Sequence, residues 1–157
     1  LVTEVGVWRN HHLATQAVER QPPLGFFRGF VLEREGEHRA TVDLKSGGVH
    51  SIIELARVYA LARGLPEVNT VERIRAAADA GALSSESADD LVDAWEFISY
   101  LRLRHQSRQV AEGRQPDNHV APDSLSTLEK KHLRDAFGIV RRQQQGLALT
   151  YQTRLMS

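Results

Sequence analysis

The chain has 157 residues, of which 20 are basic and 20 acidic, so its formal net charge is zero. This length suits one domain with a real hydrophobic core rather than two. Zero net charge argues against bulk electrostatic binding, so we expect neither nucleic acid nor a membrane as a partner. The chain has no cysteine, which excludes disulfides, thiolate metal sites and cysteine nucleophiles.

No segment looks like a membrane span or a secretion signal. The apolar runs are all shorter than the roughly 18 residues that a span needs, and no charged-then-apolar leader opens the chain. We therefore expect a cytoplasmic protein. The chain begins at Leu1, within sequence that already has a helical pattern, so we interpret it as a piece of a longer protein.

The first third of the chain mixes helical and irregular patterns. Apolar residues at helical spacing predict a helix over residues 3–20, which ends before Pro22. Three phenylalanines follow within residues 22–30, and we expect there a short helix that docks into a core. Residues 31–48 are predicted to form one irregular loop insertion. Within it, residues 39–44 alternate as a short strand or an extended loop would, and the pattern does not separate the two.

The second segment with a clear pattern is a helix that is apolar nearly all round. Ser51 with Glu54 fits a capping box at its start, and Gly64 marks its end. Because hardly any face is polar, we expect this helix at the centre of a bundle. Glu54 and Arg57 stand three residues apart and are predicted to pair with each other.

Further helix signals continue to the end of the chain. Thr70 is the predicted cap of a helix that Gly81 terminates, and a helix from residues 84–87 to about residue 112 is the longest. A loop with Gly and Pro leads to a second capping box, Ser126 with Glu129, and to a last helix. The sequence thus predicts an all-α fold, a helical bundle of five or more helices with the irregular insertion near residues 31–48.

No catalytic constellation is present. The chain lacks the phosphate-binding, dinucleotide-binding, zinc-protease and nucleophile-elbow motifs. Nucleotidyl transfer needs carboxylates that hold divalent metal against phosphates, whereas the acidic clusters at residues 33–37 and 89–93 are typical of a solvated turn and a helix start. We therefore predict no catalytic and no metal-binding residues, and no cofactor for this chain by itself.

The most informative feature lies on the longest helix. At 100° per residue, with Trp95 at zero, Arg102 falls near about −20° and His105 near about −80°, on the same side as the apolar Leu91 and Ile98. A buried guanidinium without a partner costs several kcal/mol. Two interpretations remain open at this point.

In the first interpretation, Arg102 forms an internal ion pair with an acid such as Glu54 or Asp43, and His105 is a core histidine. In the second, the side of the helix that carries Arg102 and His105 opens into a cleft that receives an anionic group, and Arg104 adds positive charge nearby. Two loop segments supply weaker candidates for ligand binding: Asp43 and Lys45 before the Gly-Gly break, and Asn118 in a Pro-Asp-Asn turn.

Six short motifs in order carry a resemblance to a known family. They stand at residues 22–27 (Pro-Pro-Leu-Gly-Phe-Phe), 43–48 (Asp-Leu-Lys-x-Gly-Gly), 55–61 (Leu-Ala-Arg-Val-Tyr-Ala-Leu), 69–73 (Asn-Thr-x-Glu-Arg), 101–106 (Leu-Arg-Leu-Arg-His-Gln) and 116–118 (Pro-Asp-Asn). Together they resemble the nucleotidyltransferase substrate-binding domain of bacterial proteins related to the PII uridylyltransferase. In such proteins the domain typically follows cyclic-nucleotide-binding-like, CBS and nucleotidyltransferase domains.

The resemblance implies a division of the chain and of the chemistry. Residues 1–21 would be a linker or N-terminal helix, and residues 22–157 the substrate-binding-type domain. The catalytic Gly-Ser and Asp-x-Asp signature, with Mg²⁺ and a nucleoside triphosphate, would belong to the upstream nucleotidyltransferase domain, so this chain would be accessory and not catalytic alone. The alternative is a helical interaction module that dimerises, or docks another domain, without a small-molecule ligand.

Overall fold

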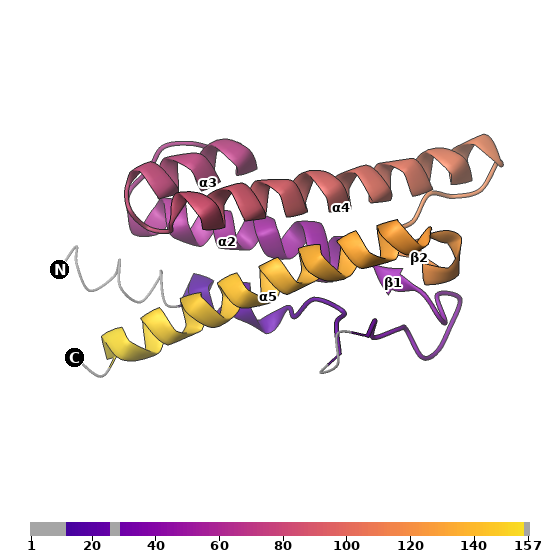
Figure 1. The fold of residues 1–157 in the computed structure, drawn as a ribbon, viewed down its shortest axis with the longest axis horizontal. Coiled ribbons are helices and arrows are strands. Elements are labelled where there is room, and N and C mark those ends of the chain that lie inside the picture. Colours follow the sequence, from indigo (N-terminus) through magenta and orange to yellow (C-terminus); the bar gives the residue numbers. More distant parts are fainter. Residues whose placement is uncertain (1–11, 26–28, 156–157) are drawn as a thin grey trace.

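The structure is a bundle of helices with one very small sheet (Figure 1). It is a computed structural model and describes residues 12–25 and 29–155, with side chains to residue 151. Residues 12–19 are helical, and the elements that follow are β1 (Val42–Asp43), η1 (Lys45–Val49), α2 (His50–Ala62), α3 (Thr70–Asp79), α4 (Ser85–Ala111), β2 (His119–Val120), η2 (Pro122–Ser124) and α5 (Thr127–Leu155). The predicted all-α bundle of five or more helices is confirmed.

Two long antiparallel helices, α4 and α5, form the frame of the bundle. They pack against each other more extensively than any other two elements of the described chain, and α3 packs on α2 and on the first part of α4 (Figure 1). The side chains between these layers are fully buried, among them Ile52 of α2, Ile98 of α4 and Phe137 of α5. The prediction that the helices around Ile52 and Leu91 are central is therefore correct for their inner faces.

The helix starts follow from capping, with corrections at Thr70 and at Ser51. Ser126 and Glu129 form the predicted capping box: the Ser126 amide donates to the Glu129 carboxylate at 2.9 Å, and the Glu129 amide donates to the Ser126 hydroxyl at 3.1 Å. Ser84 caps α4 by accepting from the Ser87 amide. The predicted cap Thr70 is wrong by one residue, because the side chain of Asn69 accepts the first amides of α3.

The capping box predicted at Ser51 and Glu54 is wrong, because the helical backbone begins earlier. A turn of π-helix, η1, runs directly into α2, so Ser51 is already inside the helix. Its hydroxyl instead donates to the backbone oxygens of Arg20 and Ser46. Glu54 accepts from Arg57, as predicted, and also lies 3.6 Å from His50.

The segment after residue 20 is more irregular than predicted. Leu24 and Phe30 pair in an isolated antiparallel bridge, which is incompatible with the short helix expected there; Phe26 and Phe27 lie outside the described residues. Residues 31–41 form the predicted irregular insertion. The predicted strand or extended loop at 39–44 resolves into the two-residue β1, which pairs with β2 in antiparallel register, Val42 opposite Val120.

Two glycines allow η1 to lie deep in the core. A Cβ atom on Gly47 would stand 2.6 Å from Cδ of Pro23 and 3.0 Å from the backbone oxygen of Gln21. A Cβ atom on Gly48 would stand 3.0 Å from Ile98. The break predicted at the Gly-Gly pair is wrong, because both glycines lie inside η1; they mark instead a point of close approach between η1, α4 and the chain at residues 21–23.

We predict that Gly47→Ala lowers the free energy of unfolding by about 1–3 kcal/mol, because the proline ring and backbone beside it cannot easily move. The matched control is Gly146→Ala, inside α5, where an added Cβ meets nothing within 4 Å. That change should stabilise the protein by roughly 0.5–1 kcal/mol. Urea unfolding of both variants measures the difference, and a Gly47→Ala variant as stable as the parent would contradict the close approach.

Candidate functional site

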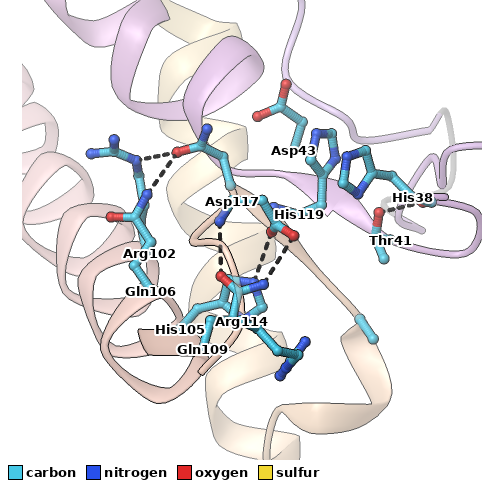
Figure 2. Close-up of polar contacts among 12 residues, drawn as sticks. His38, Thr41, Asp43, Arg102, His105, Gln106, Gln109, Arg114, Asp117 and His119 are labelled. Atoms are coloured by element: carbon cyan, nitrogen blue, oxygen red, sulfur yellow. Dashed lines mark hydrogen bonds and ion pairs between the residues drawn. The ribbon is translucent and has the colours of Figure 1, made fainter. Parts of the chain in front are cut away.

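The predicted candidate residues other than Arg104 lie towards the end of the bundle that carries β1 and β2 (Figures 1 and 2). There the loop between α4 and α5 folds back along the second half of α4, and Asp117 and Asn118 of this loop meet side chains of α4 (Figure 2). The backbone oxygen of Asn118 accepts from the Leu44 amide at 2.9 Å, which brings the segment around β1 to the same place.

Arg102 is half-buried and is held by an amide, not by an acid. Its Nε donates to Oδ1 of Asn118 at 2.6 Å, and Gln106, one turn further along α4, donates to the same oxygen at 3.2 Å (Figure 2). The expected ion pair of Arg102 with Glu54 or Asp43 is therefore wrong. The two terminal amino groups of Arg102 have no hydrogen-bond partner within the described residues.

His105, and not Arg102, contacts an acidic side chain. Its Nε2 lies 3.0 Å from Oδ1 of Asp117, and Gln109 donates to the other carboxylate oxygen at 2.9 Å. The Asp117 amide donates back to Oε1 of Gln109 at 2.8 Å, and the His119 amide donates to Asp117 at 2.8 Å. Gln109 is only 3% exposed, so these hydrogen bonds satisfy a buried polar side chain.

The same hydrogen bonds fix the charge of Asp117. Burial raises the pKa of its carboxyl, but hydrogen bonds from the His119 amide, His105 and Gln109 outweigh burial and lower the pKa from 3.8 to about 2. Asp117 is thus ionised across the neutral range. Three donors occupy its two oxygens, so it acts as an anchor of the loop and is poorly suited to be a general base.

Asp43 and Lys45 occupy the same end of the molecule in different roles. One carboxylate oxygen of Asp43 accepts from the backbone amides of Lys45 at 2.8 Å and Ser46 at 3.1 Å, and thereby starts η1. This local contact explains why Asp43 does not reach Arg102. The side chain of Lys45 is exposed, and its ammonium group has no partner within the described part of the chain.

Arg104 lies apart from the other candidates. It forms a short ion pair with Glu129 at the start of α5, and its guanidinium also lies over the ring of Tyr100, 5.4 Å from the ring centre. The hydrogen bond from Arg104, followed by that from the Ser126 amide, lowers the pKa of Glu129 to about 2, and the same ion pair raises the pKa of Arg104. Arg104 therefore joins two helices and does not add to the charge beside Arg102.

Several members of the site were missed from the sequence. Gln106 and Gln109 lie on the same stripe of α4 as Arg102, at about 20° and −40° by the same count, so their positions gave a signal. No sequence signal pointed to the contact of His119 with His38, whose rings stack with centres 3.7 Å apart and planes 9° apart. This stack ties the irregular insertion to β2 (Figure 2).

The arrangement offers cationic groups to a ligand. Within residues 12–25 and 29–155, no three His, Asp or Glu side chains lie together as metal ligands would. None of the helices in that part is long and apolar enough to span a bilayer. What the site can present is the fixed guanidinium of Arg102 and the exposed ammonium of Lys45, both suited to an anionic group.

Comparison with known proteins identifies the family. A family model described as "Putative nucleotidyltransferase substrate binding domain" matches residues 10–151. This match spans most of the chain and confirms the resemblance based on the six motifs. No curated protein and no solved structure matches the chain.

We predict that Asp117→Asn changes the dependence of stability on pH. Because the folded pKa of Asp117, about 2, lies below the ordinary 3.8, its contribution is present above about pH 4 and is lost as the pH falls towards about 2. With 32% of the side chain exposed, we expect the variant to lose about 1–2 kcal/mol near neutral pH. Its unfolding free energy should then fall less steeply in acid than that of the parent.

Urea unfolding at a series of pH values measures this effect. The control is Asp123→Asn, since the Asp123 side chain is fully exposed and should leave the pH profile unchanged. Parallel profiles for the parent and for Asp117→Asn would show that the carboxylate does not anchor the loop.

Proposed function

Because this chain belongs to the family of nucleotidyltransferase substrate-binding domains, we propose that it is the accessory domain that holds the substrate in a multidomain bacterial signalling nucleotidyltransferase. The transfer chemistry, with Mg²⁺ and a nucleoside triphosphate, would belong to a catalytic domain upstream in the same chain. CBS and cyclic-nucleotide-binding-like domains would accompany it, in a cytoplasmic protein. By itself this domain would bind and not catalyse.

The observation that carries the proposal is the state of Arg102. Its Nε is fixed by Asn118, while its terminal amino groups have no partner among the described residues. A guanidinium fixed at one edge is pre-organised to donate two parallel hydrogen bonds to a phosphate or carboxylate from the other. Asn118 holds Arg102, and Lys45 follows Leu44, whose amide donates to the backbone oxygen of Asn118, so the Lys45 ammonium would add positive charge at this end of the bundle.

A second function has its own support, from exposed apolar side chains. Tyr100 and Leu103 on α4 are 56% and 65% exposed, and Leu128 at the start of α5 is 60% exposed. Tyr100 and Leu103, three residues apart, are neighbours on the surface of α4, and neighbouring exposed apolar side chains are typical of protein contacts. They favour the alternative of an interaction module that dimerises or docks another domain.

We predict that the purified chain binds a nucleoside triphosphate and that Arg102→Ala weakens this binding at least about tenfold, the effect of losing one charged bidentate contact. Calorimetric titration with ATP and with UTP measures the binding. The control is Arg75→Ala, which removes an exposed arginine paired with Asp89 on the α3 side. Arg75→Ala should leave the affinity unchanged.

A melting curve of each variant separates lost binding from lost folding. Arg102→Ala removes one hydrogen bond and should cost no more than about 1–3 kcal/mol of stability. A parent that binds neither nucleotide but sediments as a stable dimer would instead support the interaction module.

A further inference from the structure

The positive charge of Arg102 is not neutralised by any acid. An arginine on the inward side of a helix is usually paired with a carboxylate, because a charge that leaves water without a partner is costly. Here the Nε of Arg102 donates to the side-chain oxygen of Asn118 at 2.6 Å, and no carboxylate among residues 12–25 and 29–151 forms an ion pair with this guanidinium. The half-buried arginine therefore keeps its full charge.

The acids expected to pair with Arg102, and the acid next to Asn118, all have other partners. Asp117 accepts from three donors. Asp43 accepts from the two backbone amides at the start of η1, and Glu54 of α2 forms an ion pair with Arg57. None of these three carboxylates is left to reach across to Arg102.

The other cations at this part of α4 and η1 are in a different situation. Arg104 is paired with Glu129, and His105 faces the carboxylate of Asp117. The side chains of Arg108 and Lys45 are exposed, so water solvates their charges. Arg102 differs from all of them, because it is half-buried and yet meets only uncharged groups.

Two amides hold the inner edge of the guanidinium in place. The side-chain oxygen of Asn118 accepts from Arg102 and also from Gln106, at 3.2 Å (Figure 2). Asn118 is itself fixed, because its backbone oxygen accepts from the Leu44 amide and the preceding Asp117 is anchored on α4. A fixed acceptor of this kind restricts the rotation of the arginine side chain.

An amide and a carboxylate would have opposite effects on a ligand at this position. Both accept a hydrogen bond from Nε, but the amide carries no net charge. A carboxylate would neutralise the guanidinium and compete with an anionic ligand for it. Because Asn118 occupies Nε, a ligand can form a bidentate contact only with the two terminal amino groups of Arg102.

Building on the proposed function, in which Arg102 receives an anionic group, we propose that Asn118 both positions Arg102 and determines its specificity. The amide fixes the guanidinium without neutralising it, and so reserves the charge for an oxyanion such as a phosphate group of the substrate. An aspartate at this place would hold Arg102 equally well and would make it a structural residue.

The test measures anion binding by the full chain and its variants. Calorimetric titration with inorganic pyrophosphate, at about 0.15 M salt, measures the affinity for an anion that has neither base nor sugar. A parallel titration uses ATP. Arg102→Ala gives the affinity that remains without the guanidinium, and a melting curve of each variant reports on folding.

Two changes of Asn118 separate positioning from charge. Asn118→Ala should weaken pyrophosphate binding about three- to tenfold, because Arg102 keeps its charge but is no longer fixed. Asn118→Asp keeps the size of the side chain and the acceptor but adds a negative charge. It should weaken binding at least about tenfold and leave the melting temperature within about 3 °C of the parent. A purely structural Asn118 would be replaced by aspartate without loss of affinity.

Two further variants complete the experiment. Gln106→Glu places a carboxylate one helical turn from Arg102 and should also weaken binding, so the proposal is tested even if Asn118→Asp does not fold. Gln145→Glu adds the same charge at an exposed position of α5, roughly 24 Å along the helix from Glu129, and should leave the affinity unchanged.

The possible failures are distinguishable. If Arg102→Ala weakens binding but Asn118→Asp and Gln106→Glu bind pyrophosphate as tightly as the parent, the role of Asn118 is wrong and substrate binding by Arg102 stands. An Asn118→Ala variant with the affinity of the parent would contradict the positioning role alone. A parent chain that binds neither pyrophosphate nor ATP would overturn both the proposed function and the role of Asn118.

Discussion

The carboxylate of Asp117 holds the return of the chain from α4 to α5, and the whole β1–β2 end of the molecule depends on that contact. Two of its three hydrogen-bond donors, His105 and Gln109, belong to α4, and the third is the backbone amide of His119. The carboxylate therefore holds the loop against α4. The next residue, Asn118, then accepts from Leu44, and β2 pairs with β1. Since η1 begins directly after β1, the position of the buried Gly47 also follows from this anchor.

The long helix α4 is therefore stabilised in two different ways along its length. Its first half buries Leu91 and Ile98 completely against the core. From Arg102 onward the same side of the helix is polar, and it stays half-buried because each side chain meets the loop: Gln109 is enclosed by Asp117, as Arg102 is by Asn118. A polar stripe can continue an apolar one at low cost when its buried groups find partners, as Gln109 does; the terminal amino groups of the half-buried Arg102 find none among the described residues.

The sequence allowed the helices and the inward stripe of α4 to be predicted, because both depend on periodicity within one segment. The partners of that stripe could not be predicted, because they come from a loop up to 16 residues away in the chain. Asp43 looked equally suitable for Arg102, but its carboxylate is used locally by the amides of η1. The prediction that Ser51 caps a helix was wrong for a similar reason. The π-helical turn before Ser51 has no periodic pattern in the sequence, so the earlier start of the helical backbone could not be predicted. The candidate site was thus predicted in position but not in its contacts.

The buried amide of Gln144 has a consequence for how a neighbouring domain could reach Arg102. It donates to the backbone oxygens of Ala17 and Arg20, so the first described helix is fastened beside the second half of α5. From Gln144 to Glu129, which pairs with α4 near Arg102, α5 advances by roughly 22 Å. The described chain therefore enters the bundle at the end opposite the site, and a domain attached there would have to extend along α5 to meet Arg102.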